Sequence, residues 1–258
     1  MSRIETFTLP IAPLEQSPRR IWVCLPDSYD TTKKKYDVLY MFDGHNLFSD
    51  KTATYGKSWG IREYLDRTKI DLVVIGQDCS HHGEDRMNEY CPLPVKEENM
   101  GRWVIKSQGD FTASWFVNTL KKECEKRYRI YKTREHVGIG GSSMGGLMAE
   151  YCITKYNNVF SKAACISPAT YFCRDDLNTM IQNTSFKESR IYLDFGTEER
   201  SDKESSMYLA EMMLETNHLF EQKGCRTYPH LNMNGTHSEA SWEKIVPLML
   251  EYLYPQLY

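Results

Sequence analysis

The sequence predicts an α/β fold, with a mostly parallel central sheet and helices on both of its faces. Short, nearly continuous apolar runs recur along the 258 residues, and segments of helical length separate them. Runs that are apolar on both faces are typical of strands covered on each side. Strands that alternate with helices indicate parallel pairing in one sheet. Because we find no repeat and no linker-like stretch, we expect a single domain over residues 1–258.

The expected strands are short. The first two each end at a proline, Pro10 and Pro26, and proline stops a strand. A further extended segment, residues 226–230, follows the fourth expected helix. The strands are predicted at residues 4–9, 20–25, 36–42, 72–76, 137–140, 163–166 and 191–195.

The expected helices fill the spaces between these runs. They are predicted at residues 59–67, 111–127, 147–156, 202–223 and 238–253. Gly224 follows the fourth as a C-cap residue. Residues 78–109 form the longest region without clear periodicity, too long for an ordinary connection. We therefore expect this region to form a lid or a wall of an active site.

Composition narrows the classes of partner. Hydrophobic residues make up 41 % and charged residues 26 %, which is a globular balance. A net charge of −3 gives no electrostatic reason to bind nucleic acid or an anionic membrane. No apolar stretch approaches the roughly 20 residues that span a bilayer. The expected partner is a small molecule, and the oligomeric state stays unknown.

The eight cysteines are scattered, and none forms a C-x-x-C pair. Buried free thiols in a reducing compartment fit this spacing better than disulfides do. The first residues also lack the apolar region of a secretory signal. We therefore expect a cytoplasmic protein.

Ser143 is the candidate nucleophile. It lies in Gly-Ser-Ser-Met-Gly at 141–145, between the apolar run at 137–140 and the helix-like segment at 146–151. On such a strand–turn–helix the middle serine takes a strained backbone conformation that exposes its hydroxyl group. The helix that follows favours developing negative charge.

His237 is the candidate base, because a serine hydroxyl group needs a neighbouring base to attack. It lies in a turn-like stretch that leads into the last expected helix. His230, at the end of an extended segment, is the nearest alternative, and His218 is expected on the surface of a helix. His45, His81 and His82 precede the serine and are demoted as bases.

The acid that orients the base is expected in the loop at 196–199, directly after a strand and between the serine and the histidine. We choose Glu199, three residues after Gly196. Glu198 is a real alternative, and Asp194 is weaker because it lies within the strand.

Two backbone amides are expected to form an oxyanion hole. One is that of Met144, the residue after the nucleophile. The other is that of His45, in the loop after the strand at 36–42, where Gly44 permits a tight turn. The alternative for this loop is a simple Asp-Gly turn without a catalytic role.

Six stretches between about residues 20 and 253 resemble the Putative esterase family of α/β-hydrolases. That family includes enterochelin esterases, esterase D-type enzymes, antigen 85 mycolyltransferases, and carbohydrate acetyl and feruloyl esterases. The matching stretches are residues 38–48, 58–60, 86–90, 140–146, 193–199 and 235–242. The resemblance implies Ser143 as nucleophile, His237 as base, and the amides of His45 and Met144 as oxyanion donors. It places the acid in the 196–199 loop, where glutamate replaces the commoner aspartate, so Glu198 and Glu199 both stay open.

The expected function is therefore that of a serine esterase acting on a small or carbohydrate-linked acyl ester. Acyl transfer or thioester hydrolysis (S-formylglutathione-like) by the same triad is an alternative. A non-catalytic binder with this fold and a peptidase are two more. The natural acyl and alcohol groups are not predicted.

No cofactor and no metal are expected. The run His81-His82-Gly83-Glu84-Asp85-Arg86 could be a metal site, but a polar loop is favoured because zinc ligands are usually spaced on a rigid element. Arg86 either contacts substrate or braces the loop through an ion pair. Aromatic side chains that could line a cleft, although most are expected in the core, are Trp59, Tyr90, Trp103, Trp115, Tyr171 and Phe172.

Overall fold

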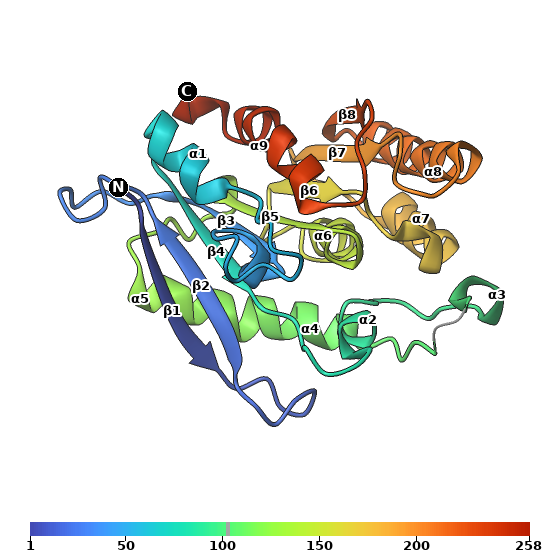
Figure 1. The fold of residues 1–258 in the computed structure, drawn as a ribbon, viewed down its shortest axis with the longest axis horizontal. Coiled ribbons are helices and arrows are strands. Elements are labelled where there is room, and N and C mark those ends of the chain that lie inside the picture. The colour runs from blue at the N-terminus through green and yellow to red at the C-terminus, as the bar shows by residue number, and fades with distance from the viewer. Residues whose placement is uncertain (102–103) are drawn as a thin grey trace.

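The computed structural model describes residues 1–101 and 104–258 and contains one mixed sheet in one α/β domain (Figure 1). The eight strands in spatial order are β1, β2, β4, β3, β5, β6, β7 and β8. Their bounds are Arg3–Leu9 (β1), Arg19–Leu25 (β2), Asp37–Phe42 (β3), Leu72–Gln77 (β4), Val137–Ser142 (β5), Lys162–Ile166 (β6), Arg190–Gly196 (β7) and Arg226–Asn232 (β8).

The pairing is parallel from β4 across to β8. Only β1 with β2 and β2 with β4 pair antiparallel among the described strands. The predicted α/β fold with a mostly parallel sheet is confirmed. Because the strands from β3 onward run the same way, the loops at their carboxyl ends meet at one edge of the sheet.

Helices cover both faces of the sheet. Helices α1 and α9 pack on one face, and α4 to α8 pack on the other. The helices are Ile61–Thr68 (α1), Asp85–Glu89 (α2), Glu97–Met100 (α3), Gly109–Trp115 (α4), Lys121–Arg127 (α5), Met144–Lys155 (α6), Arg174–Asn183 (α7), Lys203–Gln222 (α8) and Glu239–Leu253 (α9).

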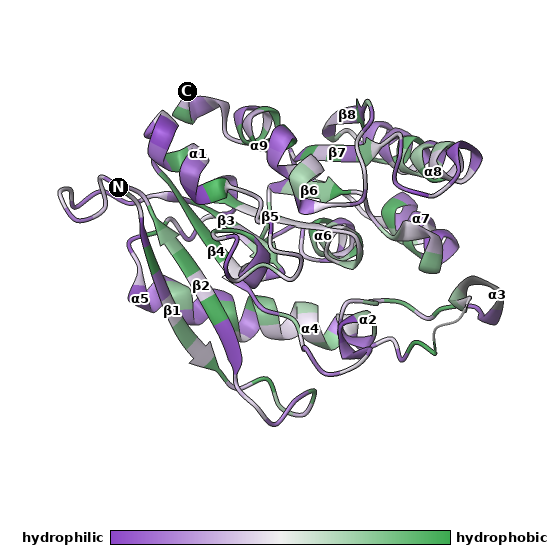
Figure 2. Ribbon diagram, viewed as in Figure 1, coloured by the Kyte–Doolittle hydropathy of each residue, from purple (hydrophilic) through white to green (hydrophobic). Residues whose placement is uncertain are grey.

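Strand β3 illustrates why the apolar runs are continuous. Leu39 and Met41 pack in the core beneath α1 and α9, whereas Val38, Tyr40 and Phe42 pack in the core on the opposite face. Successive side chains of a strand point to opposite faces, so a strand covered on both sides needs apolar residues throughout. The neighbouring strand β4 is likewise largely green in Figure 2, whereas α8 alternates between purple and green.

The helix boundaries differ from the predicted ones for local reasons. Helix α1 begins at Ile61 because Gly60 has a φ of 60°, and α6 begins three residues earlier than expected, directly after Ser143. The helix expected at 111–127 contains a wider π-helical turn, Phe116–Leu120, between α4 and α5. The short α2 and α3, within residues 78–109, and α7 were not predicted.

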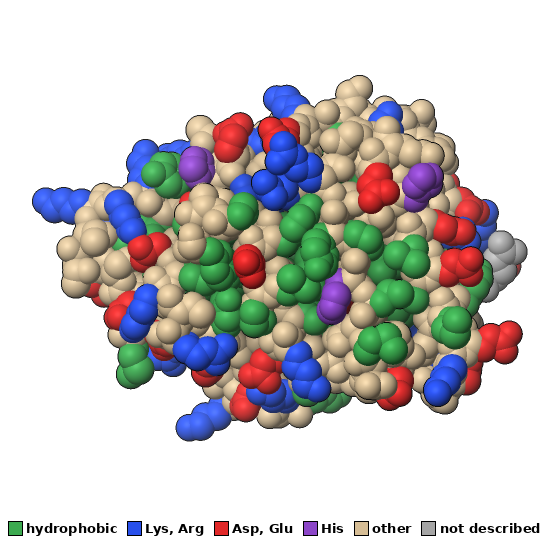
Figure 3. All heavy atoms as spheres, turned by 90° about the horizontal axis from the view of Figure 1, so that it is seen from above, with side chains coloured by type: hydrophobic (Ala, Val, Ile, Leu, Met, Phe, Trp, Pro, Cys, Tyr) green, Lys and Arg blue, Asp and Glu red, His purple; other side chains and the backbone are tan. Residues whose placement is uncertain are grey.

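The described surface carries mixed charge where it is visible. On the face shown in Figure 3, Lys and Arg side chains lie among Asp and Glu side chains and apolar ones.

All eight cysteines are buried and free, as the sequence predicted. Within residues 1–101 and 104–258, no helix has both the length and the apolar character needed to cross a bilayer.

Glu150 of α6 has a consequence for stability. Its side chain is fully buried, and desolvation raises the pKa of its carboxyl group to about 8, although a hydrogen bond of 2.6 Å from Thr170 Oγ1 partly offsets this. The native state therefore keeps a proton that the unfolded chain releases above a pKa of about 4.3. The contribution of Glu150 to the free energy of unfolding is therefore fully present below the pKa of the unfolded chain. It is lost as the pH rises from there towards the pKa of the folded state.

Glu150→Gln should abolish this pH dependence. Between about pH 5.5 and about pH 7.5, we expect the free energy of unfolding of the variant to gain about 2–3 kcal/mol on that of the wild type, at about 1.4 kcal/mol per pH unit. Urea denaturation at both pH values measures the difference. Glu211→Gln, at an exposed position of α8, is the control. Parallel curves for Glu150→Gln and wild type would contradict the assignment.

Candidate active site

The site lies at the carboxyl edge of the sheet, where loops after successive strands meet. Ser143 follows β5, Glu199 lies in the loop after β7, and His237 lies between β8 and α9. Two cavities, of about 370 Å³ and about 420 Å³, both contain Ser143 and His237 in their walls. The two side chains predicted as nucleophile and base therefore border the same space.

Ser143 has the strained backbone that the motif predicts. Its φ is 59° and its ψ is −123°, a combination that costs an ordinary residue on the order of 1–3 kcal/mol. Hydrogen bonds hold it there: its amide donates to Ile166 O at 2.9 Å, and its carbonyl oxygen accepts from Ala169 N at 3.0 Å. Helix α6 begins at the next residue.

The tight turn requires glycine on both sides of the serine. A Cβ atom at Gly141 would lie 2.7 Å from the backbone of Gly145, and one at Gly146 would lie 2.7 Å from Ile166 O. Both distances are well below van der Waals contact. Gly141 of the motif and Gly146 directly after it therefore let β5, α6 and β6 approach closely behind Ser143.

His237 is hydrogen-bonded to Glu199. The distance from His237 Nδ1 to Glu199 Oε2 is 2.8 Å; the Glu199 side chain is 2 % exposed and that of His237 is 38 % exposed. The edge of the His237 ring also packs against Trp242 of α9, with ring centroids 5.2 Å apart. A buried carboxylate thus orients a partly exposed imidazole ring.

The other carboxylate oxygen of Glu199 is also held in place. Oε1 accepts hydrogen bonds from Gly196 N, at 3.0 Å, and from Ser167 Oγ. Ser167 Oγ in turn accepts from Trp242 Nε1 at 3.0 Å. Ser167 was not predicted as a site residue; the available signal was its position directly after the apolar run at 163–166.

The alternative acids and bases lie elsewhere. Glu198 is exposed and lines a separate cavity of about 1170 Å³ between α8 and the loops after β7 and β8, which contains neither Ser143 nor His237. Asp194 is buried in β7 and pairs with His230, with 2.6 Å between Oδ2 and Nδ1. The structure thus brings Glu199, and not Glu198 or Asp194, to His237.

Met144 and His45, whose amides are the predicted oxyanion donors, each line a cavity together with Ser143. Met144 is the first residue of α6, so its amide has no acceptor within its own helix. His45 lies in a 3-10 helix, Gly44–Asn46, directly after β3. A Cβ atom at Gly44 would lie 2.6 Å from the Gly76 backbone, so the loop packs tightly on β4.

The two cavities share Ser143 and His237 but differ in the other residues of their walls. The smaller contains the side chains of Tyr171, Phe172, Phe195 and Leu209 together with the charged residues Glu199 and Arg200. The other is formed by the loops after β3 and β4 together with α9. Ser143 therefore borders two spaces that each have polar and apolar side chains in their walls.

Of the aromatic candidates, Tyr171 and Phe172 line a cavity with Ser143. Trp59, Tyr90 and Trp115 are buried in the core. Trp103 lies outside the described residues. Of the region expected as a lid or wall, Met87 lines the smaller cavity, and residues 79–81, 83 and 86 line the other.

Arg86 braces the loop through an ion pair and also lines the larger of the two cavities. Its Nε and one terminal nitrogen each lie 2.8 Å from a carboxylate oxygen of Asp43. Burial works against ionisation of Asp43, but the Arg86 guanidinium outweighs it and holds the pKa of that carboxyl group below its usual range. This bidentate pair ties the loop after β4 to the loop after β3.

The strand order, the strand–turn–helix at the nucleophile and a histidine loop before the last helix together define an α/β-hydrolase. Comparison with known proteins assigns the chain to one family within this class. The model of the family described as Putative esterase matches residues 14–253, so the chain belongs to that family of esterases.

Individual relatives are more distant. A curated protein of Bacillus subtilis (strain 168), YbbA, which is described as uncharacterized, is 25 % identical over 187 residues, covering 72 % of this chain and 71 % of its own. An IroE-like serine hydrolase from Shewanella oneidensis has a TM-score of 0.70 at 16 % identity, over 99 % of this chain and 80 % of its own. An S-formylglutathione hydrolase from Agrobacterium tumefaciens has a TM-score of 0.70 at 15 % identity, over 100 % and 96 %.

Arg86→Met should be strongly destabilising, because it leaves the buried Asp43 carboxylate unpaired. We expect a loss of about 2–4 kcal/mol in the free energy of unfolding, towards the lower part of the range for broken buried pairs because the Arg86 side chain is 30 % exposed. The double variant Asp43→Asn/Arg86→Met should recover much of it. Chemical denaturation measures all three proteins.

The control is the exposed pair of Arg226 and Glu188, at 3.1 Å, with side chains 61 % and 72 % exposed. Arg226→Met should change stability by no more than about 1 kcal/mol. If the double variant is as unstable as Arg86→Met alone, lost packing and not the unpaired charge is the cause.

Proposed function

We propose that this chain is a serine carboxylic-ester hydrolase with Ser143 as nucleophile, His237 as base and Glu199 as acid. One observation carries the proposal: His237 Nδ1 lies 2.8 Å from Glu199 Oε2, at a cavity wall that includes Ser143. A proton on Nδ1, held by the carboxylate, leaves Nε2 with the lone pair that accepts the serine proton.

Acylation begins when Ser143 Oγ attacks the ester carbonyl carbon and its proton passes to His237 Nε2. The carbonyl electrons move to oxygen, where the amides of Met144 and His45 donate hydrogen bonds to the resulting oxyanion. The positive end of α6 adds to this stabilisation. When the intermediate collapses, the bond to the alcohol oxygen breaks and the imidazolium gives its proton to the alcohol.

Deacylation repeats these steps with water. His237 takes a proton from water as the oxygen attacks the acyl carbon, and the collapse returns that proton to Ser143 Oγ. The carboxylic acid then leaves. Glu199 stays ionised throughout and stabilises the imidazolium, while Gly196 N and Ser167 hold its second oxygen.

The cavities support a small or carbohydrate-linked acyl ester as substrate. A space of about 370 Å³ with the apolar side chains of Phe172, Phe195 and Leu209 suits a short acyl group. The second cavity, with the hydrogen-bonding side chains of Asn46 and Glu239 in its wall, suits a hydroxylated alcohol group.

Ser143→Ala tests the proposal directly. We expect purified wild type to hydrolyse p-nitrophenyl acetate and to be labelled covalently by a fluorophosphonate probe. The variant should lose the label and at least about 10³-fold in kcat, since the nucleophile is gone. An unchanged circular dichroism spectrum controls for folding. Equal hydrolysis by the two proteins would end the proposal.

Glu199→Gln and Glu198→Gln test the acid as a matched pair. Glu199→Gln keeps the size of the side chain but cannot stabilise the imidazolium, so kcat should fall by about 10²–10⁴-fold. Glu198→Gln should stay near wild type because Glu198 is exposed in another cavity. Steady-state kinetics across pH measures both. A larger loss for Glu198→Gln would reverse the assignment.

A further inference from the structure

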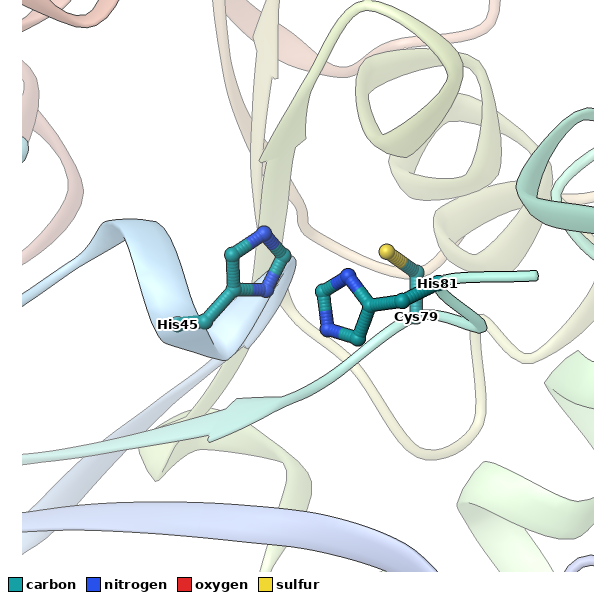
Figure 4. Close-up of side chains that lie close together, drawn as sticks. All are labelled: His45, Cys79 and His81. Carbon is teal, nitrogen blue, oxygen red and sulfur yellow. The ribbon is translucent and has the colours of Figure 1, made fainter. Parts of the chain in front are cut away.

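Three potential metal ligands meet beside the proposed active site. The ligand atoms of His45, Cys79 and His81 all lie within 4.8 Å of one another. Figure 4 shows the two imidazole rings and the sulfur atom gathered between the loops after β3 and β4. These strands are parallel neighbours, so their carboxyl ends bring together residues more than thirty positions apart. The rings of His45 and His81 pack edge to face, 4.7 Å between centroids.

The donor set selects a particular class of cation. One thiolate and two imidazole nitrogens suit Zn²⁺ and other thiophilic divalent ions, whereas Mg²⁺ and Ca²⁺ prefer oxygen. Around a tetrahedral zinc ion, such atoms lie roughly 3.3–3.6 Å apart, from bond lengths of about 2.0 Å to nitrogen and about 2.3 Å to sulfur. His81 is exposed, so its side chain is free to close the remaining gap.

His45 is already oriented as a ligand. The His45 residue is 6 % exposed, and the distance from its Nε2 to Thr54 Oγ1 is 3.0 Å. In the tautomer that carries its proton on Nε2 and donates to this hydroxyl group, Nδ1 keeps a lone pair; Nδ1 is buried and makes no hydrogen bond. Asp78 Oδ1 lies 3.3 Å from Nδ1 and accepts a hydrogen bond from Trp22. A hydrogen bond that fixes the second nitrogen is typical of metal-ligating histidine.

Cys79 supplies the sulfur donor of the cluster. Its residue is 5 % exposed, and it lines the same cavity as His45 and His81. Coordination takes the thiolate form, so the thiol proton passes to solvent as the metal–sulfur bond forms. The positive charge of Arg86 nearby is compensated by its pair with Asp43.

We propose that His45, Cys79 and His81 form a three-ligand site for Zn²⁺ or a similar thiophilic divalent cation, with its fourth position open to the cavity that contains Ser143 and His237. The site shares that wall with the catalytic residues. If the chain is the proposed esterase, occupancy inhibits it, since the ion ties down the His45 residue whose amide is the proposed oxyanion donor.

Cobalt titration tests binding without any use of activity. Co²⁺ added to the chelator-treated protein should give one equivalent of binding, with a sulfur-to-cobalt charge-transfer band in the near ultraviolet. Cys79→Ser should lose the band. His81→Ala, at an exposed position that the fold tolerates, should weaken binding at least about 10-fold. His82→Ala is the matched control, because His82 is adjacent, 73 % exposed and outside the cluster.

Two further measurements separate the possible outcomes. His237→Ala should retain the cobalt band, which distinguishes this site from an ion captured by the proposed base. Zn²⁺ should inhibit p-nitrophenyl acetate hydrolysis by wild type and by His82→Ala, but not by His81→Ala, each relative to its own metal-free rate. Absence of the band, or a band that survives Cys79→Ser, overturns the site. Binding without inhibition overturns its link to catalysis.

Discussion

The backbone of Ser143 is the constraint on which the rest of the site depends. Its positive φ is maintained because Ile166 O accepts from its amide and Ala169 N donates to its carbonyl group. Both partners belong to β6 or the loop that follows it. The turn therefore depends on the pairing of β5 with β6, and the hydroxyl group is positioned by the sheet itself.

The same edge of the sheet gathers several buried carboxyl groups whose partners give them different properties. Glu199 is surrounded by donors from Gly196, Ser167 and His237. Asp43 is paired with the guanidinium of Arg86, which favours its charged form. Glu150 has a single hydroxyl donor from Thr170 and, among the residues that the structure describes, no cation beside it, so burial raises its pKa. The charge of each carboxyl group at this edge thus depends on its hydrogen-bond and ion-pair partners as well as on its burial.

The loops after β3 and β4 act as one structural unit. The bidentate contact between Asp43 and Arg86 joins them, and Gly44 packs against Gly76. The same proximity brings His45 to Cys79 and His81. Because this unit carries the amide proposed as an oxyanion donor, any ligand that fixes or shifts it acts on the reaction as well. The contacts that hold these two loops together therefore also underlie the proposed inhibition by a bound cation.

Much of the fold was determined by the sequence alone. Strands such as residues 38–42 are apolar on both faces, which predicts a sheet covered on both sides. Because strands alternate with helices along the chain, the sheet was predicted to be mostly parallel. The strand–turn–helix at Ser143 was also predicted from the sequence, because glycine spacing and a following helix are local features. Helix α7 was not predicted, since its apolar pattern is short: Leu177 and Ile181 are buried in the core and Met180 is partly buried against it.

Tertiary structure decided what depends on distance across the chain. Position after Gly196 favoured Glu199 in the sequence but left Glu198 open, and it is the path of the loop after β7 that turns Glu199 towards His237 and leaves Glu198 exposed. The pairing of Arg86 with Asp43 and the meeting of His45 with Cys79 likewise depend on which strands are neighbours. Sequence patterns encode local conformation and burial, whereas contacts between loops depend on strand order.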